Sequence, residues 1–181
     1  MDTPKTNRRR SVLKILFGTS IASLFLPTKK VLALDEKRLS FYHTHTEKKL
    51  EIAYSRDGEY IDSALVEINS FLADFRTGDV TSMDPKLLDL MYDIRESLGS
   101  RGTFEVISAY RSPKTNEMLR NQSGGVAKNS QHLLGKAIDV RLEDVDLPKL
   151  RDVALAMQRG GVGYYEKSNF VHVDTGRVRR W

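Results

Sequence analysis

The chain contains the stretch Ser130-Gln-His-Leu-Leu-Gly-Lys-Ala-Ile-Asp139, which joins a polar turn to the start of a β-strand. Residues 136–142 alternate in character, so that Ile138 and Val140 share one face of this strand and Asp139 lies on the other. Aliphatic side chains at alternate positions indicate a face that packs against a core. The pattern therefore predicts a strand with a carboxylate on its second face.

A second stretch, Asn169-Phe-Val-His-Val-Asp174, has the same alternation. Its two valines are expected to face the core, which puts His172 and Asp174 on the opposite face. If the two strands lie side by side, Asp139 and His172 come together. His132 precedes the first strand by a turn that contains glycine, a residue that lets the backbone bend sharply and return the imidazole to the same place.

His132, Asp139 and His172 have the composition of a zinc site. Two imidazoles and one carboxylate supply three ligands and leave the fourth position of a tetrahedral ion for water, which is typical of catalytic zinc. The chain has no cysteine, so thiolate ligands are excluded. The alternative is that each residue is an ordinary core or surface side chain, as most single histidines and aspartates are. We expect one zinc ion per chain.

The positive charge of the chain is concentrated at its N-terminus. The formal net charge is +5, yet residues 34–181 contain 22 basic and 23 acidic side chains. With this balance of charges, residues 34–181 are not expected to form the broad positive surface that nucleic-acid binding requires, so no nucleic-acid partner is expected. Arg177, Arg179 and Arg180 form a small local patch, which favours solvation over a binding site.

The N-terminal segment resembles a twin-arginine export signal. Arg9-Arg10-Ser11-Val12-Leu13-Lys14 precedes an apolar run over residues 15–26 and the small-residue site Val31-Leu32-Ala33. The run is shorter and more polar than a membrane span of about 20 residues, so no stable span is expected after cleavage. The alternative is an uncleaved amphipathic anchor. We expect a signal peptide over residues 1–33 and a periplasmic domain over residues 34–181.

Residues 34–181 predict helices packed on a sheet. Alternation and β-forming composition predict strands over residues 39–42, 50–54, 103–109, 162–165 and 170–174, in addition to the strand that carries Asp139. Apolar residues at spacings of three and four predict helices over residues 62–75, 84–98 and 148–158, with a shorter helix over residues 114–120. Residues 122–130 are expected to form a loop at the rim of a substrate groove. The fold class is therefore α+β, a small, mainly antiparallel sheet with helices packed on it.

Three sequence blocks in the same order resemble the YcbK type of murein endopeptidase. They are Ser108-Ala-Tyr-Arg-Ser-Pro113, the stretch from Ser130 to Asp139, and Gly161-Val-Gly-Tyr-Tyr165 followed by Phe170-Val-His-Val-Asp-Thr-Gly176. This type is related to zinc D-alanyl-D-alanine carboxypeptidases, in a group that includes lysostaphin-type peptidases and the hedgehog signalling domain. The resemblance covers most of the chain, from about residue 39 to residue 181.

The resemblance implies a fold like that of the hedgehog and D-Ala-D-Ala peptidase domains, with a zinc peptidase domain over residues 34–181. The implied function is hydrolysis of peptide cross-links or stem peptides of peptidoglycan by a metal-activated water, for cell-wall remodelling. His132, Asp139 and His172 are the implied zinc ligands, and peptidoglycan peptides are the implied partner.

The resemblance also implies roles for Arg111 and Ser130. Arg111 matches the arginine of the first block, where it stabilises the charge that develops on the scissile carbonyl. A permanently charged, planar guanidinium suits that task, and the alternative is a structural salt bridge at a strand end. Ser130 matches a substrate-facing polar residue in related enzymes, or it only shapes the loop before His132.

The general base is where this chain departs from related carboxypeptidases. They place a glutamate or histidine two or three residues before the last ligand, whereas this chain has Asn169 and Phe170 there. Asp174, two residues after His172 on the same strand face, is the candidate base or the hydrogen-bond partner of that ligand. Glu166 is the second candidate for the base.

Other functions and sites stay open at this point. A catalytically silent, hedgehog-like module would keep the zinc and bind cell-wall peptides, and the missing base supports it. A non-haem iron oxygenase also uses two histidines and a carboxylate, but six residues separate His132 from Asp139, and an exported enzyme lacks ready access to cytoplasmic oxo-acid cosubstrates. His43 and His45 lie two apart on one strand face and are either a second metal site or exposed strand histidines.

Overall fold

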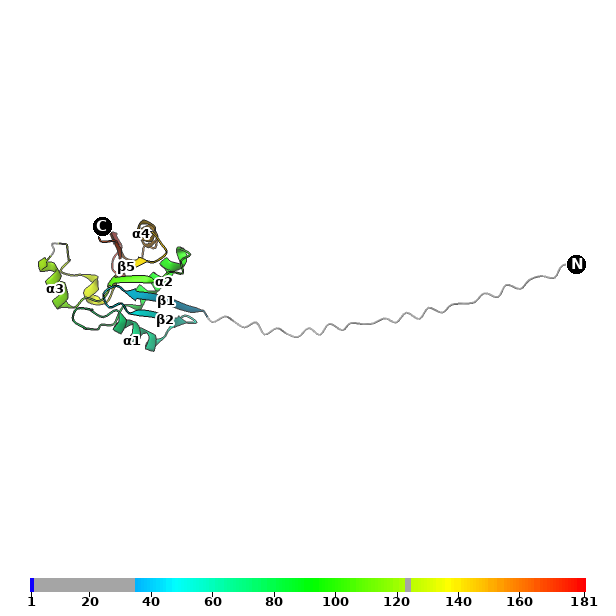
Figure 1. Ribbon diagram of the computed structural model, residues 1–181, viewed down its shortest axis with the longest axis horizontal. Helices are drawn as coiled ribbons and strands as arrows, with labels where there is room; N and C mark the ends of the chain where they lie inside the picture. Colours follow the sequence, from blue (N-terminus) through cyan, green and yellow to red (C-terminus); the bar gives the residue numbers. More distant parts are fainter. Residues whose placement is uncertain (2–34, 123–124) are drawn as a thin grey trace. The chain divides into compact units, whose positions relative to one another are not determined.

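The computed structural model describes residue 1 and residues 35–122 and 125–181 (Figure 1). Apart from Met1, the predicted signal peptide lies outside the described residues. Within the described part of the chain, none of the helices has both the length and the apolar character needed to cross a membrane.

Among the described residues, eight strands form one sheet in the order β3-β2-β1-β4-β5-β7-β6-β8. Neighbouring strands are antiparallel except for two parallel pairs, β1 with β4 and β6 with β8. The strands are β1 (Glu36–His43), β2 (Lys49–Arg56), β3 (Glu59–Tyr60), β4 (Phe104–Ser108), β5 (Ala137–Leu142), β6 (Gly161–Tyr165), β7 (Phe170–Asp174) and β8 (Arg179–Arg180). The sequence did not indicate β3, β8 or the two parallel pairings.

Four α-helices accompany the sheet in the part of the chain that the structure describes, so the α+β class is confirmed (Figure 1). They are α1 (Asp62–Phe71), α2 (Pro85–Ser97), α3 (Pro113–Gln122) and α4 (Leu147–Ala156). Helix α1 contacts β2, α2 contacts β1, and α4 contacts β5, β6 and β7. Helix α2 begins as predicted, because Asp84 accepts a hydrogen bond from the backbone N–H of Lys86 and Pro85 occupies the first helical position.

Helix α1 ends at Phe71, four residues before the predicted end. Beyond it the backbone turns around Asp74, whose carbonyl oxygen accepts hydrogen bonds from Thr77 N and Gly78 N. The Asp74 carboxylate also accepts hydrogen bonds from Arg76 N and Ser112 N. An aspartate that binds nearby backbone N–H groups offers the chain an alternative to the helix, which explains the early end.

The core lies on the face of β5 and β7 that carries their aliphatic residues. Ile138, Val140, Val171 and Val173 are all buried in one cluster with apolar residues of α1, α2 and α4. Burying each such side chain contributes roughly 1.5–3 kcal/mol. Because side chains alternate along a strand, this burial directs Asp139 to the opposite face of the sheet.

Candidate metal centre

Strands β5 and β7 bring together the two stretches that carry Asp139 and His172. The antiparallel register places Asp139 directly opposite His172, next to the pair of Ile138 and Val173. Directly opposed residues project from the same face with Cβ atoms about 5 Å apart. The register therefore produces the juxtaposition that the alternation of each strand predicts.

A short 3₁₀ helix, η1 (Gln131–Leu134), positions His132. Ser130 Oγ accepts a hydrogen bond from His132 N at 3.3 Å, and Gly135 ends the turn with φ of 65°. Glycine adopts this left-handed conformation without steric cost, and a Cβ atom at Gly135 would lie 2.5 Å from Ser82 O. The turn therefore requires glycine, and it returns the imidazole of His132 to β5.

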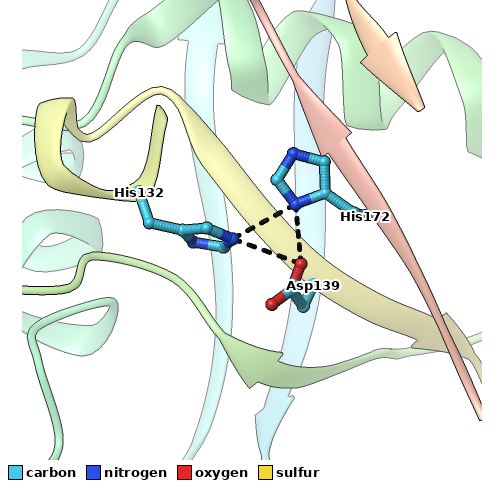
Figure 2. A group of neighbouring side chains, drawn as sticks. All are labelled: His132, Asp139 and His172. Carbon is cyan, nitrogen blue, oxygen red and sulfur yellow. Dashed lines mark hydrogen bonds and ion pairs between the residues drawn. The ribbon is translucent and has the colours of Figure 1, made fainter. Parts of the chain in front are cut away.

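Donor atoms of His132, Asp139 and His172 form a small triangle (Figure 2). His132 Nε2 lies 3.1 Å from His172 Nδ1 and 3.2 Å from Asp139 Oδ1, and His172 Nδ1 lies 2.8 Å from Asp139 Oδ1. Ligand atoms about 2.0–2.1 Å from a tetrahedral zinc ion are about 3.3 Å from one another. All three residues are buried, and within the described residues they are the one such group able to hold a metal ion. The donor set therefore fits a tetrahedral zinc ion.

Hydrogen bonds on the outer ring nitrogens determine which nitrogen faces the triangle. His132 Nδ1 lies 2.6 Å from Ala109 O, which can only accept, so Nδ1 carries the proton and Nε2 offers a lone pair. His172 Nε2 lies 2.9 Å from the Asp174 carboxylate and donates to it, which leaves the lone pair of Nδ1 for the triangle. Both imidazoles are thus held in the tautomer that a metal requires.

Burial and charge oppose each other at these residues. Burial by itself raises the pKa of Asp139, but the charge and hydrogen bond that His132 supplies when protonated, and the hydrogen bond of protonated His172, hold that pKa well below its usual value. Burial by itself lowers the pKa of His172, but the hydrogen bonds that the protonated ring makes to Asp139 and Asp174 more than offset this and raise it. Asp139 is therefore ionised at neutral pH, the form that binds a cation.

Asp174 is fully buried on the far side of the His172 ring. Besides His172, its carboxylate accepts hydrogen bonds from Gly161 N at 3.0 Å, Gly176 N at 2.8 Å and two nitrogens of Arg179 at 3.0 and 2.6 Å. Both oxygens are engaged, so the position suits a residue that orients His172 and does not suit a general base. The sequence left two roles open for Asp174, and the geometry favours the hydrogen-bond partner of His172 over the general base.

Arg111 lies beside the triangle. Its Nη2 is 3.6 Å from Asp139 Oδ2, and its backbone N donates to His132 O at 3.2 Å. Burial lowers the pKa of the guanidinium, and the charge of Asp139 partly offsets this. Nε is buried without a hydrogen-bond partner among the described residues. The salt bridge considered from the sequence is thus present, but it leaves donors of Arg111 available to another acceptor.

A cavity of about 350 Å³ opens at the triangle. The residues that line it are Arg111, Gly125, Val126, Ala127, Asn129, Ser130, Gln131, His132, Asp139, Tyr165, Ser168, Phe170, His172, Arg179 and Trp181. Residues 125–127 and 129–131 thus form part of its rim, and the sequence predicted a loop over residues 122–130. Asp139 is the single carboxylate among the described lining residues. Glu166, the second candidate base, is exposed in the turn between β6 and β7.

Sequence reasoning missed several residues of this site, among them Tyr165, Phe170, Arg179 and Trp181. Arg179 was expected to be solvated, and this is wrong because its guanidinium binds the buried Asp174 carboxylate. Tyr165 and Phe170 belong to a recognisable block, which was a signal for them. Trp181 follows no periodic pattern, so nothing local pointed to it.

His43 and His45 lie in an aromatic cluster. His43 is fully buried with its ring centroid 5.5 Å from that of Phe75, and His45 stacks on Phe75 at 4.1 Å. Within the described residues no acidic or histidine side chain joins them to make a group of three. The contacts favour a packing role over a second metal site, and the alternative of exposed histidines is wrong for His43, which is buried.

A family model and several known proteins are similar to this chain. The family model described as peptidoglycan L,D-endopeptidase MepK matches residues 31–181. The peptidoglycan L,D-endopeptidase MepK of Escherichia coli strain K12 is 40% identical over 184 residues, which cover 100% of both chains. The probable peptidoglycan L,D-endopeptidase MepK of Haemophilus influenzae is 41% identical over 170 residues, which cover 93% of this chain and 88% of its own. No solved structure matches significantly. The resemblance noted from the sequence is thus confirmed, and the chain belongs to the MepK family of peptidoglycan L,D-endopeptidases.

Proposed function

We propose that this chain is a zinc-dependent peptidoglycan endopeptidase that hydrolyses peptide cross-links of the cell wall. The observation that carries the proposal is the buried triangle of His132, Asp139 and His172, with donor atoms 2.8–3.2 Å apart at a cavity, in a member of this family. The names of the relatives supply the bond class, a peptide bond between an L and a D centre.

The residues at the triangle and around it have different roles in this proposal. His132, Asp139 and His172 would hold the zinc ion, which when bound lowers the pKa of a water ligand and polarises a carbonyl. Asp174 keeps the Nδ1 lone pair of His172 directed at the triangle by accepting the proton of Nε2. Ser130 caps the turn that carries His132 and lines the cavity, which suits both roles considered for it.

Arg111 would stabilise the negative charge that develops on the scissile carbonyl oxygen. It is a largely buried, permanently charged group that lines the cavity, and in a site of low dielectric such a group favours the transition state. Arg111→Ala should lower kcat by about 100-fold to 1000-fold while zinc stays bound, by analogy with the loss of one oxyanion donor. Arg101→Ala, at an exposed position, is the matched control. Unchanged kcat in Arg111→Ala would assign Arg111 a structural role only.

The decisive experiment uses defined cross-linked muropeptide dimers. The protein is incubated with them after metal removal by a chelator, and again after zinc is restored, and mass spectrometry identifies the products. Zinc-dependent conversion of dimers to monomers supports the proposal, and the product masses identify the bond. Dimers that persist in the presence of fully zinc-loaded protein would refute it.

One observation favours a second candidate, a catalytically silent zinc module that binds cell-wall peptides. Among the described lining residues the cavity offers no carboxylate besides the ligand Asp139, so no free base of that kind is seen there. Tight binding of muropeptides without cleavage would select the silent module.

We also infer that the α+β fold is the one shared by hedgehog and D-Ala-D-Ala peptidase domains. The antiparallel pairing of the two strands that carry Asp139 and His172 supports this.

We further propose that residues 1–33 are a twin-arginine signal peptide and that residues 34–181 act in the periplasm. The support is the Arg9-Arg10 motif, the short apolar run and the small residues before Leu34. A peptidoglycan substrate is found outside the cytoplasmic membrane, so export and the proposed activity require the same compartment.

A further inference from the structure

Trp181, the last residue of the chain, packs over a proposed zinc ligand. The indole and the imidazole of His172 have centroids 5.1 Å apart. Trp181 is 50% exposed and lines the same cavity as the triangle. The C-terminal residue thus forms part of the wall of the site.

Gly163 makes room for the indole. It lies directly opposite His172 in the β6–β7 ladder, and a Cβ atom at Gly163 would lie 2.6 Å from Cε2 of Trp181. The indole therefore occupies the space that a side chain of β6 would fill beside His172. An aromatic ring that covers a glycine in a sheet in this way pins the local geometry.

Several contacts fix the indole in this place. Trp181 N donates to Val162 O at 3.3 Å, and Trp181 O accepts from Tyr164 N at 3.1 Å. The indole Nε1 donates to Tyr165 Oη at 2.7 Å, and the guanidinium of Arg179 lies 4.9 Å from the ring centroid. Trp181 is therefore held both through its backbone and at the polar edge of its ring.

Trp181 continues an aromatic wall. Tyr165 and Phe170 stack with centroids 4.5 Å apart, and both line the cavity. One side of the site is thus aromatic while the triangle and Arg111 form a polar side. Aromatic side chains offer large rigid apolar surfaces for ligand contact.

We propose that Trp181 is a specificity-determining residue that contacts the aliphatic chain of the diamino acid in the peptide cross-link. This inference rests on the proposed function. The cross-linking residue has a run of methylene groups between charged or amide ends, so an apolar wall beside a polar reaction centre matches its chemistry. The contact acts on substrate binding, whereas metal binding depends on the triangle and Asp174.

The test compares zinc-loaded full-length Trp181→Ala and Trp181→Phe with the wild type on a defined muropeptide dimer that is cross-linked through such a diamino acid. Trp181→Ala should raise KM by roughly tenfold or more, with kcat within about threefold and zinc content unchanged. Trp181→Phe should be intermediate, since phenylalanine retains a ring but not the Nε1 hydrogen bond. Val178→Ala is the control, because Val178 is exposed in the same segment and lines a different cavity.

Fluorescence gives a readout that does not depend on turnover. Trp181 is the only tryptophan of the chain, so the emission of the protein reports this position. Adding the dimer should shift or quench the emission saturably in the wild type. Gly163→Ala keeps the tryptophan but displaces the indole, and it should change the emission of the free protein and weaken dimer binding.

The outcomes separate the two proposals. If the wild type does not cleave the dimer, the proposed function fails. The fluorescence titration then tests by itself whether Trp181 contacts the dimer. A KM within twofold of the wild type in Trp181→Ala, or emission that does not respond to saturating dimer, would overturn the assignment. Loss of zinc from Trp181→Ala would also overturn it, because the ring would then support the metal site instead of the substrate.

Discussion

Replacing Asp174 with asparagine tests how the chain holds His172. In the wild type one carboxylate oxygen accepts hydrogen bonds from Gly161 N, Gly176 N and Arg179, and the other accepts from His172 and Arg179. An amide has one oxygen and one NH₂ group. Whichever way it is placed, its NH₂ group therefore faces donors, and at least two hydrogen bonds are lost.

The size of the effect follows from burial and charge. Asp174 is fully buried, and each hydrogen bond to a charged group contributes roughly 1.5–3 kcal/mol. Removing one partner of a buried ion pair costs about 3–5 kcal/mol, but the side chain of Arg179 is 28% exposed and recovers part of this in water. We expect a loss of about 3 kcal/mol in unfolding free energy, or roughly 6–12 °C in Tm. Zinc affinity should fall by about 10-fold to 100-fold, as for other residues that orient metal ligands.

Thermal unfolding and zinc titration against a competing chelator measure these two quantities. Asp152→Asn is the matched control, because the Asp152 side chain is 63% exposed and its pairing with Arg151 lies at the surface. Asp174→Asn with wild-type Tm and wild-type zinc affinity would refute the reasoning. If Asp174→Asn kept wild-type Tm and zinc affinity but lost turnover, the result would indicate that Asp174 is the general base.

Three further predictions concern the turn, the acid stability and the N-terminus. Gly135→Ala should lower the free energy of unfolding, measured with urea, by about 1–3 kcal/mol, because φ is 65° and Ser82 O blocks the new methyl group. An unchanged urea midpoint would contradict this. Burial by itself raises the pKa of Asp89, but hydrogen bonds from Tyr60, Lys37 and Tyr54 more than offset this and lower it. The stabilisation from ionised Asp89 is therefore complete above about pH 4 and is lost as pH falls through the lower pKa of the folded state. Asp89→Asn should therefore make the free energy of unfolding less dependent on pH in this acidic range. Identical pH dependence in the variant and the wild type would contradict this. If the proposed signal peptide is cleaved, N-terminal sequencing of protein recovered from a periplasmic fraction should begin at Leu34, and an intact Met1 there would exclude cleavage.

The sequence alone indicated the three residues of the triangle and most of the elements, because both are encoded locally. The alternation around Ile138 and Val171 set which face of each strand meets the core, and this fixed the faces of Asp139 and His172. Asp84 followed by Pro85 marked the start of α2 in the same local way. Hydrophobic periodicity and caps depend on neighbours a few residues apart, so they can be read without a structure.

Tertiary structure alone decided the partners of these residues. The register that opposes Asp139 to His172, the parallel β6–β8 pairing that places Trp181 beside Gly163, and the burial of Asp174 against Arg179 all join separate elements. A carboxylate two residues after a ligand has the same sequence signature whether it is a base or an orienting partner. Only the packed chain shows which groups occupy its oxygens, because hydrogen bonds across strands depend on register and on the whole core, not on local spacing.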